Sequence, residues 1–276
     1  MAKGVYACID GVSRNVKQIP VCVEGVSRNT KEGWACVDGV SRKFFPGGIA
    51  LGDLEIGTSV FMNVNGVRTE FLIVHIGCPS SDGGTYTNAD GIWLLMKDIY
   101  TERTWDSRGG RYYADCDIHK YLTTTFFNLL DEGVASQILQ AGLPYTTSSS
   151  SASGALGSVT ATVFLLSVQE LYGKNVLGSI RKEGGALDYF KYSTATGLTD
   201  ENQRRYAYYN GNLSNWWTRS HYYDDQYNVI YVRGQDAFNK PGQFIQRYYN
   251  YSGIGVRPAM IFPHETAIDE NFNIIA

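Results

Sequence analysis

The segment DCDIH, residues 115–119, holds the side chains best suited to chemistry, a thiol and an imidazole set among carboxylates. Cys116 and His119 could act as a nucleophile and its base, or could join the aspartates in a metal site. The segment also stands at the start of a predicted helix, where Asp residues serve as N-caps and interact favourably with the helix dipole. We therefore expect a structural role for these residues, with the nucleophilic and metal-binding hypotheses as alternatives.

Other titratable residues give weaker signals. His75 follows the apolar run FLIV and is expected to be a hydrogen-bonded histidine of the core or its edge. Asp224 and Asp225 are adjacent, and neighbouring side chains on a strand point to opposite faces, so they do not form the opposed pair that acid/base catalysis requires. The sequence contains no G-x-S-x-G, H-E-x-x-H or phosphate-binding glycine loop motif. We therefore expect no enzyme activity, no metal ion and no cofactor.

Tyrosine is concentrated in one region, because ten of the 20 tyrosines lie between residues 206 and 251. Tyr offers a large, stiff contact area with a polar tip, and Asp, Asn, Ser and Arg add adaptable hydrogen bonds, as in antibody paratopes. A cross-strand aromatic ladder is the structural alternative, although the interleaved aspartates and asparagines disfavour it. The pattern favours an exposed ligand-binding surface beside a buried Trp216-Trp217 anchor. The predicted ligand-binding residues are His221, Tyr222, Tyr223, Asp224, Asp225, Tyr227, Asn228, Tyr231, Arg233, Asp236, Phe238, Arg247, Tyr248, Tyr249, Asn250 and Tyr251.

Turn and periodicity signals predict the elements that must carry this surface. Residues 59–77 place Asn65-Gly66 between two alternating apolar runs, which is typical of a β-hairpin. Residues 91–100 and the run TATVFLLS at 160–167 are predicted to be further strands. The Ser/Thr/Gly-rich residues 146–158 are predicted to form a mobile loop.

Helical signals are fewer but specific. Residues 117–130 carry Ile118, Leu122, Phe126 and Leu129 at helical spacing, with Asp117 as the expected N-cap. Residues 132–139 suggest a second, short helix, and the tetrapeptide 167–170, with Ser first and Glu last, forms a capping box that opens a third. Strands mixed with short helices predict an α+β fold.

Three copies of a short motif open the sequence: CIDGVSR at 8–14, CVEGVSR at 22–28 and CVDGVSR at 36–42. Each copy places an acidic residue and Gly between β-prone segments, and Gly supplies the positive φ that a two-residue hairpin turn needs. We predict three hairpins over residues 1–46, followed by the main domain over 47–276. Cys8, Cys22 and Cys36 are expected to be small packed side chains, since no histidine accompanies them as in a metal ladder.

Composition excludes several classes of function. The formal net charge is −3 and charged residues are 18% of the chain, so no basic field attracts nucleic acid or an anionic membrane. No apolar run reaches the length of a membrane span, and we expect neither membrane insertion nor a signal peptide. The five cysteines include no C-x-x-C pair, which favours a reducing compartment over a disulfide framework.

Several motifs together resemble a known family. In chain order they are GDLEIGTSVFMNV, DCDIHKYL, VFLLSVQELYG, RRYA, WWTRS and GVRPAMIF, spanning roughly residues 50 to 263. They are similar to the variable proteins of diversity-generating retroelements, which have a C-type lectin fold related to formylglycine-generating enzymes. The resemblance implies a scaffold of Trp216, Trp217, Arg219, Gly255, Arg257 and Pro258 with retroelement-directed substitutions in the tyrosine-rich runs. The calcium-dependent sugar-binding motifs of true C-type lectins, Glu-Pro-Asn and Trp-Asn-Asp, are missing.

The resemblance implies a receptor-binding protein of a phage or prophage tail. The N-terminal repeats are similar to glycine-centred repeats of tail-associated proteins, so they would dock to tail proteins while the tyrosine-rich face binds a host-surface protein or glycan. The expected location is the virion tail, and a homo-oligomer such as a trimer is a further expectation. A diversified bacterial surface or intracellular binding protein without a virion role is the alternative. A formylglycine-generating-like enzyme is a second alternative, although no cysteine follows Cys116 to supply the copper-binding pair that this chemistry requires.

Overall fold

The chain is described from a computed structural model. It gives the backbone of residues 6–9, 12–15, 20–23, 26–29, 33–37 and 40–45, and describes in full 49–109, 112–147, 156–172, 180–190, 201–222, 227–234 and 242–275, apart from the side chains of 201 and 202. The described part is mostly sheet with a few short helices, so the prediction of an α+β fold is confirmed. No helix among these residues is both long and apolar enough to cross a membrane.

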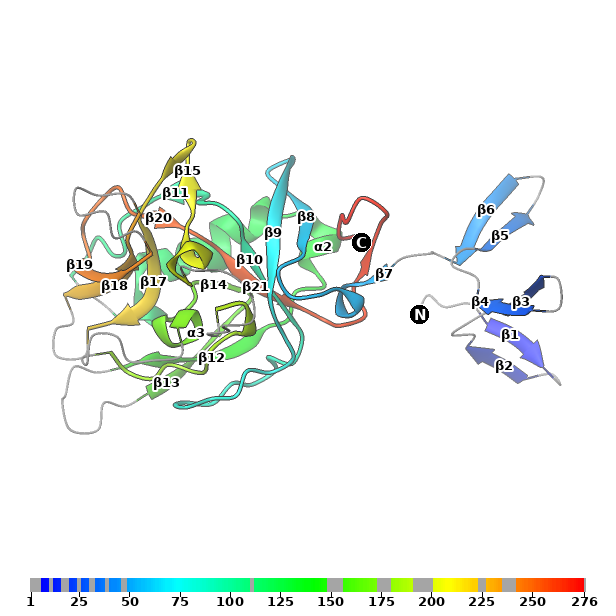
Figure 1. Cartoon of the computed structure of the whole chain (residues 1–276), viewed down its shortest axis with the longest axis horizontal. Helices are drawn as coiled ribbons and strands as arrows, with labels where there is room; N and C mark the ends of the chain where they lie inside the picture. Colours follow the sequence, from blue (N-terminus) through cyan, green and yellow to red (C-terminus); the bar gives the residue numbers. More distant parts are fainter. Residues whose placement is uncertain are drawn as a thin grey trace.

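The repeats form three separate antiparallel hairpins (Figure 1). In each hairpin the two strands are joined through two residues, as the register Ile9 opposite Val12 illustrates. The predicted hairpins are therefore confirmed, whereas the side chains of Cys8, Cys22 and Cys36 lie outside the described residues. The strands are β1 (Tyr6–Ile9), β2 (Val12–Asn15), β3 (Pro20–Val23), β4 (Val26–Asn29), β5 (Gly33–Val37) and β6 (Val40–Phe45).

The first of two five-stranded sheets joins the beginning and the end of the main domain. Its order is β14-β21-β10-β9-β8, and every pairing is antiparallel. The late strand β21 thus lies in one sheet with the first hairpin, β8 and β9, separated from it only by β10 (Figure 1). The bounds are β8 (Ser59–Val64), β9 (Val67–Ile76), β10 (Ile92–Met96), β14 (Val163–Phe164) and β21 (Ala259–Phe262).

The turn of this hairpin is the predicted one. Asn65 and Gly66 both have positive φ, 53° and 73°. Two successive residues with positive φ define the turn whose twist matches the flanking strands. Strand β10, predicted from its apolar run, is buried at all five positions in the middle of the sheet.

The second sheet, in the order β11-β20-β17-β18-β19, carries the tyrosine-rich sequence. Strand β17 is buried at all six positions, whereas β19 is the edge strand and its last three residues are exposed. Strand β17 runs parallel to β20 and antiparallel to β18. The bounds are β11 (Thr101–Glu102), β17 (Trp216–His221), β18 (Asn228–Val232), β19 (Phe244–Tyr248) and β20 (Gly255–Val256).

The main domain also contains three two-stranded ribbons, and one of them shows that a prediction was wrong. Strands β12 and β13 pair over six residues each, so residues 146 and 156–158 of the predicted mobile loop are strand. The alternation of polar and small residues there masks its strand character, and residues 148–155 lie outside the described part. The ribbons are β12 (Ala141–Thr146) with β13 (Leu156–Ala161), β15 (Tyr208–Tyr209) with β16 (Asn212–Leu213), and β7 (Ile49–Ala50) with β22 (Ala267–Ile268).

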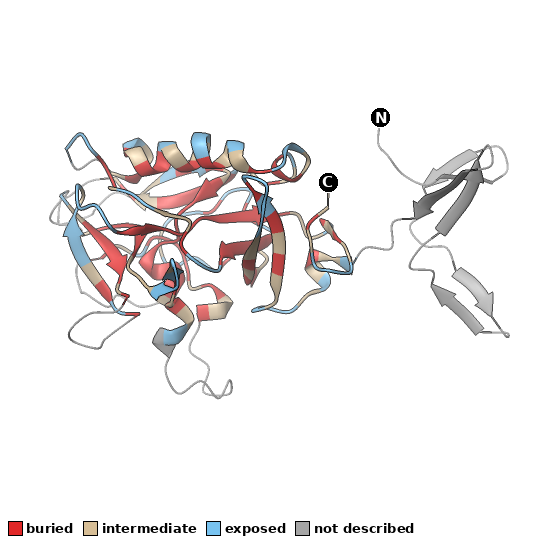
Figure 2. Ribbon diagram, turned by 90° about the horizontal axis from the view of Figure 1, so that it is seen from above, coloured by how far each residue is buried: buried red, intermediate tan, exposed pale blue. Residues whose placement is uncertain are grey.

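The longest helical segment runs from residue 117 to 129 and changes type along its length. It buries Ile118, Leu122 and Phe126 and exposes its outer side, which Figure 2 shows by colour. The N-cap is Cys116 and not Asp117 as predicted, because Asp117 is already helical; the Asp117 carboxylate accepts from Arg108. The segment comprises α1 (Asp117–Lys120), the π-helix η3 (Tyr121–Phe126) and the 3-10 turn η4 (Phe127–Leu129).

The remaining helices are short. The predicted capping box is present, because the Ser167 backbone N–H donates to the Glu170 carboxylate at 2.9 Å and the Glu170 N–H donates to Ser167 Oγ at 3.1 Å. The predicted helix at 132–139 is only one turn long. The elements are α2 (Glu132–Ala135), α3 (Val168–Tyr172), η1 (Leu51–Asp53), η2 (Tyr113–Asp115), η5 (Asp188–Phe190) and η7 (Glu201–Arg205).

A buried ion pair joins α3 to the second sheet. Arg219 of β17 donates to both carboxylate oxygens of Glu170, at 2.6 and 2.5 Å, and both side chains are inaccessible to solvent. Arg219 also donates to the carbonyls of Pro144 and Leu165. Burial disfavours the charged guanidinium, but the Glu170 carboxylate outweighs this and raises the pKa of Arg219. Strand β17 is thereby held to α3 and β12 at once.

We expect Arg219→Met to lower the free energy of unfolding by about 3 to 5 kcal/mol, because it leaves the Glu170 carboxylate buried without its cation. The double variant Arg219→Met/Glu170→Gln should recover part of this loss, since no uncompensated charge remains. Urea unfolding of both variants measures the difference. Arg247→Met, an exposed arginine, is the matched control and should stay within about 0.5 kcal/mol of the parent. A loss below about 1 kcal/mol in Arg219→Met would contradict the central role of the pair.

Candidate ligand-binding surface

Within the DCDIH segment Cys116 and His119 are buried in the core, whereas Asp115 is exposed. The Cys116 thiol is fully buried and lies 3.1 Å from the Tyr113 carbonyl oxygen, to which it donates. Burial raises the pKa of this thiol well above its usual range, so the reactive thiolate is disfavoured. The His119 ring packs against the Tyr113 ring, with centroids 4.8 Å apart, and burial lowers its pKa to about 4.

The carboxylates and histidines nearby also have structural partners. The Asp117 carboxylate accepts hydrogen bonds from Ser107 and from Arg108 Nη2, the latter at 2.7 Å. Partial burial opposes its ionisation, but these bonds outweigh burial and hold the pKa of Asp117 below its usual range. His75 is buried, and its Nδ1 lies 2.8 Å from Asp188 Oδ2, so this ring nitrogen has the polar partner that was expected. Nowhere in the described residues do three His, Cys, Asp or Glu side chains gather as a metal ion would require.

Exposed aromatic side chains are concentrated where β19 ends and where the chain enters β18. Tyr227, Tyr248 and Tyr251 are 43%, 56% and 47% exposed. Arg247, which directly precedes Tyr248, is also exposed, and Tyr249 is half-buried. We call Tyr227, Arg247, Tyr248, Tyr249 and Tyr251 the tyrosine cluster.

The members of the tyrosine cluster contact one another. The rings of Tyr227 and Tyr248 are stacked, with centroids 6.3 Å apart and planes inclined by 12°. Tyr249 lies beside both, at 6.1 and 6.2 Å. The Arg247 guanidinium lies 5.2 Å from the centre of the Tyr251 ring, within the range of a cation–π contact. Because the rings restrict one another, less rotamer freedom is left to be lost when a ligand binds.

The backbone of the cluster is fixed to the core through a residue that sequence analysis missed. The Tyr249 carbonyl accepts from the Trp105 N–H at 2.9 Å, and the Tyr249 N–H donates to the Tyr227 carbonyl, also at 2.9 Å. Trp105 is fully buried and its ring lies 5.9 Å from that of Trp217. An isolated tryptophan in a polar segment is seldom exposed, and this is the signal that could have indicated its role.

Two predicted binding residues are buried, which corrects their assignment to the exposed surface. His221 is 1% exposed and its ring packs 5.3 Å from that of Trp105. Tyr231 is 3% exposed and stands opposite Trp217 across the β17–β18 pair. The physical reason is that β17 and β18 are interior strands covered on both faces, so alternation does not bring either residue outward.

The other predicted residues fall into three groups. Tyr222, Asn228 and Arg233 are half-buried at the margin of the sheet. Asn250 is exposed in the turn next to the tyrosine cluster. Five predicted residues lie outside the described part of the chain: Tyr223, Asp224, Asp225, Asp236 and Phe238.

Comparison with protein families gives one match. Residues 90–264 match a domain of unknown function, DUF6273. The chain therefore belongs to the DUF6273 family. The DUF6273 match begins just before β10 and ends just after β21, so it includes the whole second sheet and the tyrosine cluster but not the β8–β9 hairpin. No curated protein and no solved structure matches the chain.

The buried His119 predicts a stability change at mildly acidic pH. Its pKa is lowered from 6.5 to about 4 by burial, so the unfolded chain binds a proton between these values that the folded chain does not. Above pH 6.5 His119 is neutral in both states, and as the pH approaches 4 its titration alone lowers the free energy of unfolding by up to about 3 kcal/mol. Urea unfolding at several pH values measures this slope.

His119→Phe is the control, because it keeps a ring against Tyr113 but cannot titrate. Its free energy of unfolding should fall less steeply between pH 6.5 and 4. The stability that ionised Asp117 contributes is lost only below its ordinary pKa of 3.8, outside this window. Equal slopes in the two proteins would contradict a neutral, buried His119.

Proposed function

We propose that this DUF6273 protein is a binding protein whose tyrosine cluster contacts a macromolecular ligand. One observation carries the proposal: exposed, mutually packed tyrosines occupy the edge strand and its turn, while the strands behind them are buried. Exposed aromatic side chains with a polar tip are enriched in binding surfaces because they supply contact area at low entropic cost. A buried cross-strand ladder, the structural alternative, does not account for exposures near one half.

The proposal includes a C-type-lectin-like scaffold diversified by a retroelement. The residues assigned to its constant part are all buried, which supports a division between a fixed interior and a changeable edge. Trp216 Nε1 donates to the Arg205 carbonyl and Trp217 Nε1 to the Arg103 carbonyl, both at 2.9 Å. The buried scaffold residues are Trp216, Trp217, Arg219, Gly255, Arg257 and Pro258.

Within this proposal the protein acts at the tail tip of a phage or prophage. The three hairpins would dock to tail proteins, and the tyrosine cluster would bind a protein or glycan on the host surface. A diversified bacterial binding protein without a virion role is the second candidate, because the binding surface itself does not depend on a virion. Binding rather than catalysis is proposed for either case, since the only cysteine in the DUF6273 region is the buried Cys116.

The tyrosine cluster should be dispensable for folding and required for binding. We expect Tyr227→Ser/Tyr248→Ser/Tyr251→Ser to keep its melting temperature within a few degrees, because exposed substitutions cost about 0.5 kcal/mol or less each. Attachment to host cells should be lost, since an aromatic anchor at an interface commonly contributes about 2 kcal/mol or more. Thermal melting and a cell-attachment assay with whole virions or purified protein measure the two effects.

Trp217→Ala is the control with the opposite behaviour, because it removes a fully buried ring and should unfold the domain. Tyr100→Ser, away from the cluster, controls for the loss of a half-buried tyrosine and should leave attachment unchanged. A triple variant that melts well below the parent, or that attaches normally, would show that these tyrosines are structural.

Retroelement diversification predicts where sibling copies of the gene differ. Sequencing of the gene from many descendants of one lysogen should place substitutions at the codons of Tyr227, Tyr248 and Tyr251. The codons of Trp217 and Arg219 should stay unchanged, because each of these side chains is fully buried. Substitutions spread evenly along the chain would argue against diversification, whether or not the protein has a virion role.

A further inference from the structure

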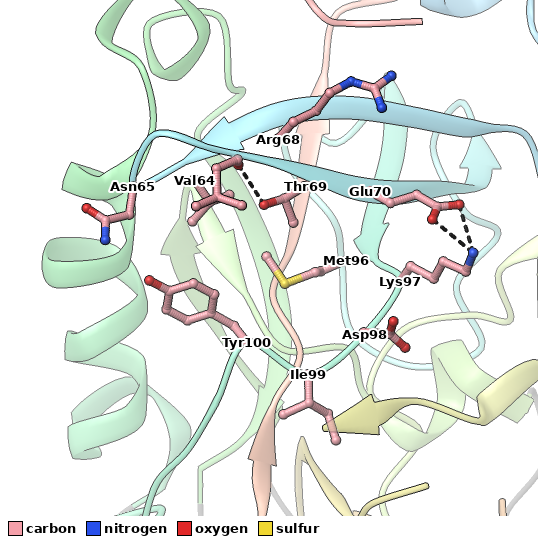
Figure 3. Close-up of a pocket in the computed structure, with 11 residues that line it drawn as sticks. Val64, Asn65, Arg68, Thr69, Glu70, Met96, Lys97, Asp98, Ile99 and Tyr100 are labelled. Atoms are coloured by element: carbon pink, nitrogen blue, oxygen red, sulfur yellow. Dashed lines mark hydrogen bonds and ion pairs between the residues drawn. The ribbon is translucent and has the colours of Figure 1, made fainter. Parts of the chain in front are cut away.

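A cleft lies beside the first hairpin, and no member of the tyrosine cluster lines it. It consists of two hollows of about 390 and 320 Å³ that share Lys97 and Asp98 in their walls. Figure 3 shows the larger hollow, between the β8–β9 hairpin and the segment after β10, with Met96, Ile99 and Tyr100 among its apolar lining. The combined size suits a small organic molecule.

The smaller hollow, which we call the Arg257 pocket, is lined by a buried arginine. Arg257 is 1% exposed, its Nε donates to the Met96 carbonyl at 2.8 Å, and its guanidinium lies 4.9 Å from the centre of the Trp216 ring. Its Nη1 is buried and has no hydrogen-bond partner among the described residues. A buried charged donor without a partner costs free energy, which a bound acceptor would recover.

The charges around the Arg257 pocket favour an anion. Lys97 is held by Glu70, with Nζ 2.9 Å from Oε2, so that pair is neutral as a whole. Arg204 and Arg257 then face a single carboxylate, Asp98, which leaves a net positive charge. Burial lowers the pKa of Arg257 to about 10, with Tyr189 and Asp98 acting in the opposite direction. Arg257 nonetheless stays charged at neutral pH.

We propose that the Arg257 pocket binds a small organic monocarboxylate, with its carboxylate against Arg257 and Arg204 and its apolar part in the larger hollow. A guanidinium binds a carboxylate through charge-assisted hydrogen bonds, which are stronger than neutral ones. Tyr189 and Tyr208 add aromatic walls to the Arg257 pocket itself. In the larger hollow the exposed Val67 and the half-buried Tyr100 offer the apolar surface that a carbon chain requires. This site is additional to the tyrosine cluster and does not depend on the function proposed for it.

The first test compares three probes of the same carbon length on the full chain. Hexanoate, hexanol and hexylamine share an apolar chain and differ in the group that would meet Arg257. Calorimetric or NMR titration at neutral pH should show binding of hexanoate alone. Equal binding of hexanol, preference for hexylamine, binding of inorganic phosphate in place of hexanoate, or no binding of hexanoate at millimolar concentration would each overturn the proposal.

Two variants test the charges without touching the scaffold contacts of Arg257. Arg204→Gln should weaken hexanoate binding about tenfold or more, as the loss of one charge-assisted hydrogen bond predicts. Asp98→Asn keeps an oxygen that can accept the hydrogen bond that the Tyr208 N–H makes to Asp98 Oδ1 at 3.0 Å, and removes a repulsive charge. It should therefore tighten binding several-fold. Arg247→Gln, in the tyrosine cluster, is the control and should bind as the parent does. Unchanged affinity in both test variants would overturn the proposal.

Discussion

The buried pair of Arg219 and Glu170 is the interaction on which the rest of the main domain depends. The Glu170 carboxylate accepts four hydrogen bonds, two from Arg219, one from the Tyr86 hydroxyl at 2.8 Å and one from the Ser167 backbone. Two charges out of water are tolerated only when each lone pair and proton is used in this way. The bonds come from segments far apart in sequence, so the pair can form only when β17, α3 and the segment around Tyr86 are all in place.

This arrangement separates the contacts that stabilise the domain from the exposed tyrosine cluster. Because β17 is held from the interior and Trp105 fixes the backbone at Tyr249, the outer half of β19 and its turn contribute little to the core. A second buried carboxyl group, Glu183, accepts hydrogen bonds from Thr146 and Ser220, but burial outweighs these bonds and raises its pKa. Substitutions on the exposed edge therefore meet few packing constraints, as the proposed diversification would require.

Local signals predicted much of this fold, and long-range contacts account for what they missed. The Asn65-Gly66 turn, the Ser167–Glu170 capping box and the buried Trp216-Trp217 pair each follow from a few neighbouring residues. The burial of His221 and Tyr231 does not, because it depends on which strands lie beside β17 and β18. The β12–β13 ribbon was missed because its polar and small residues do not resemble a strand; these residues are strands because the two segments pair with each other. The Arg257 pocket joins β9, the residues just after β10, η7 and the residue after β20, and no sequence pattern brings these together.

Arg257 also relates the pocket to the scaffold behind the tyrosine cluster. It follows β20, whose Gly255 pairs with Trp216 of β17, and its guanidinium lies over the Trp216 ring. A ligand that binds only the folded chain stabilises it by mass action, whatever else it does. For a ligand at Arg257 to change binding at the tyrosine cluster, β17 would need two arrangements, and the ligand would have to bind one of them more tightly than the other. Strand β17 is buried along its whole length and held by Arg219, so a carboxylate at Arg257 should raise the stability of the scaffold while leaving the affinity of the tyrosine cluster unchanged.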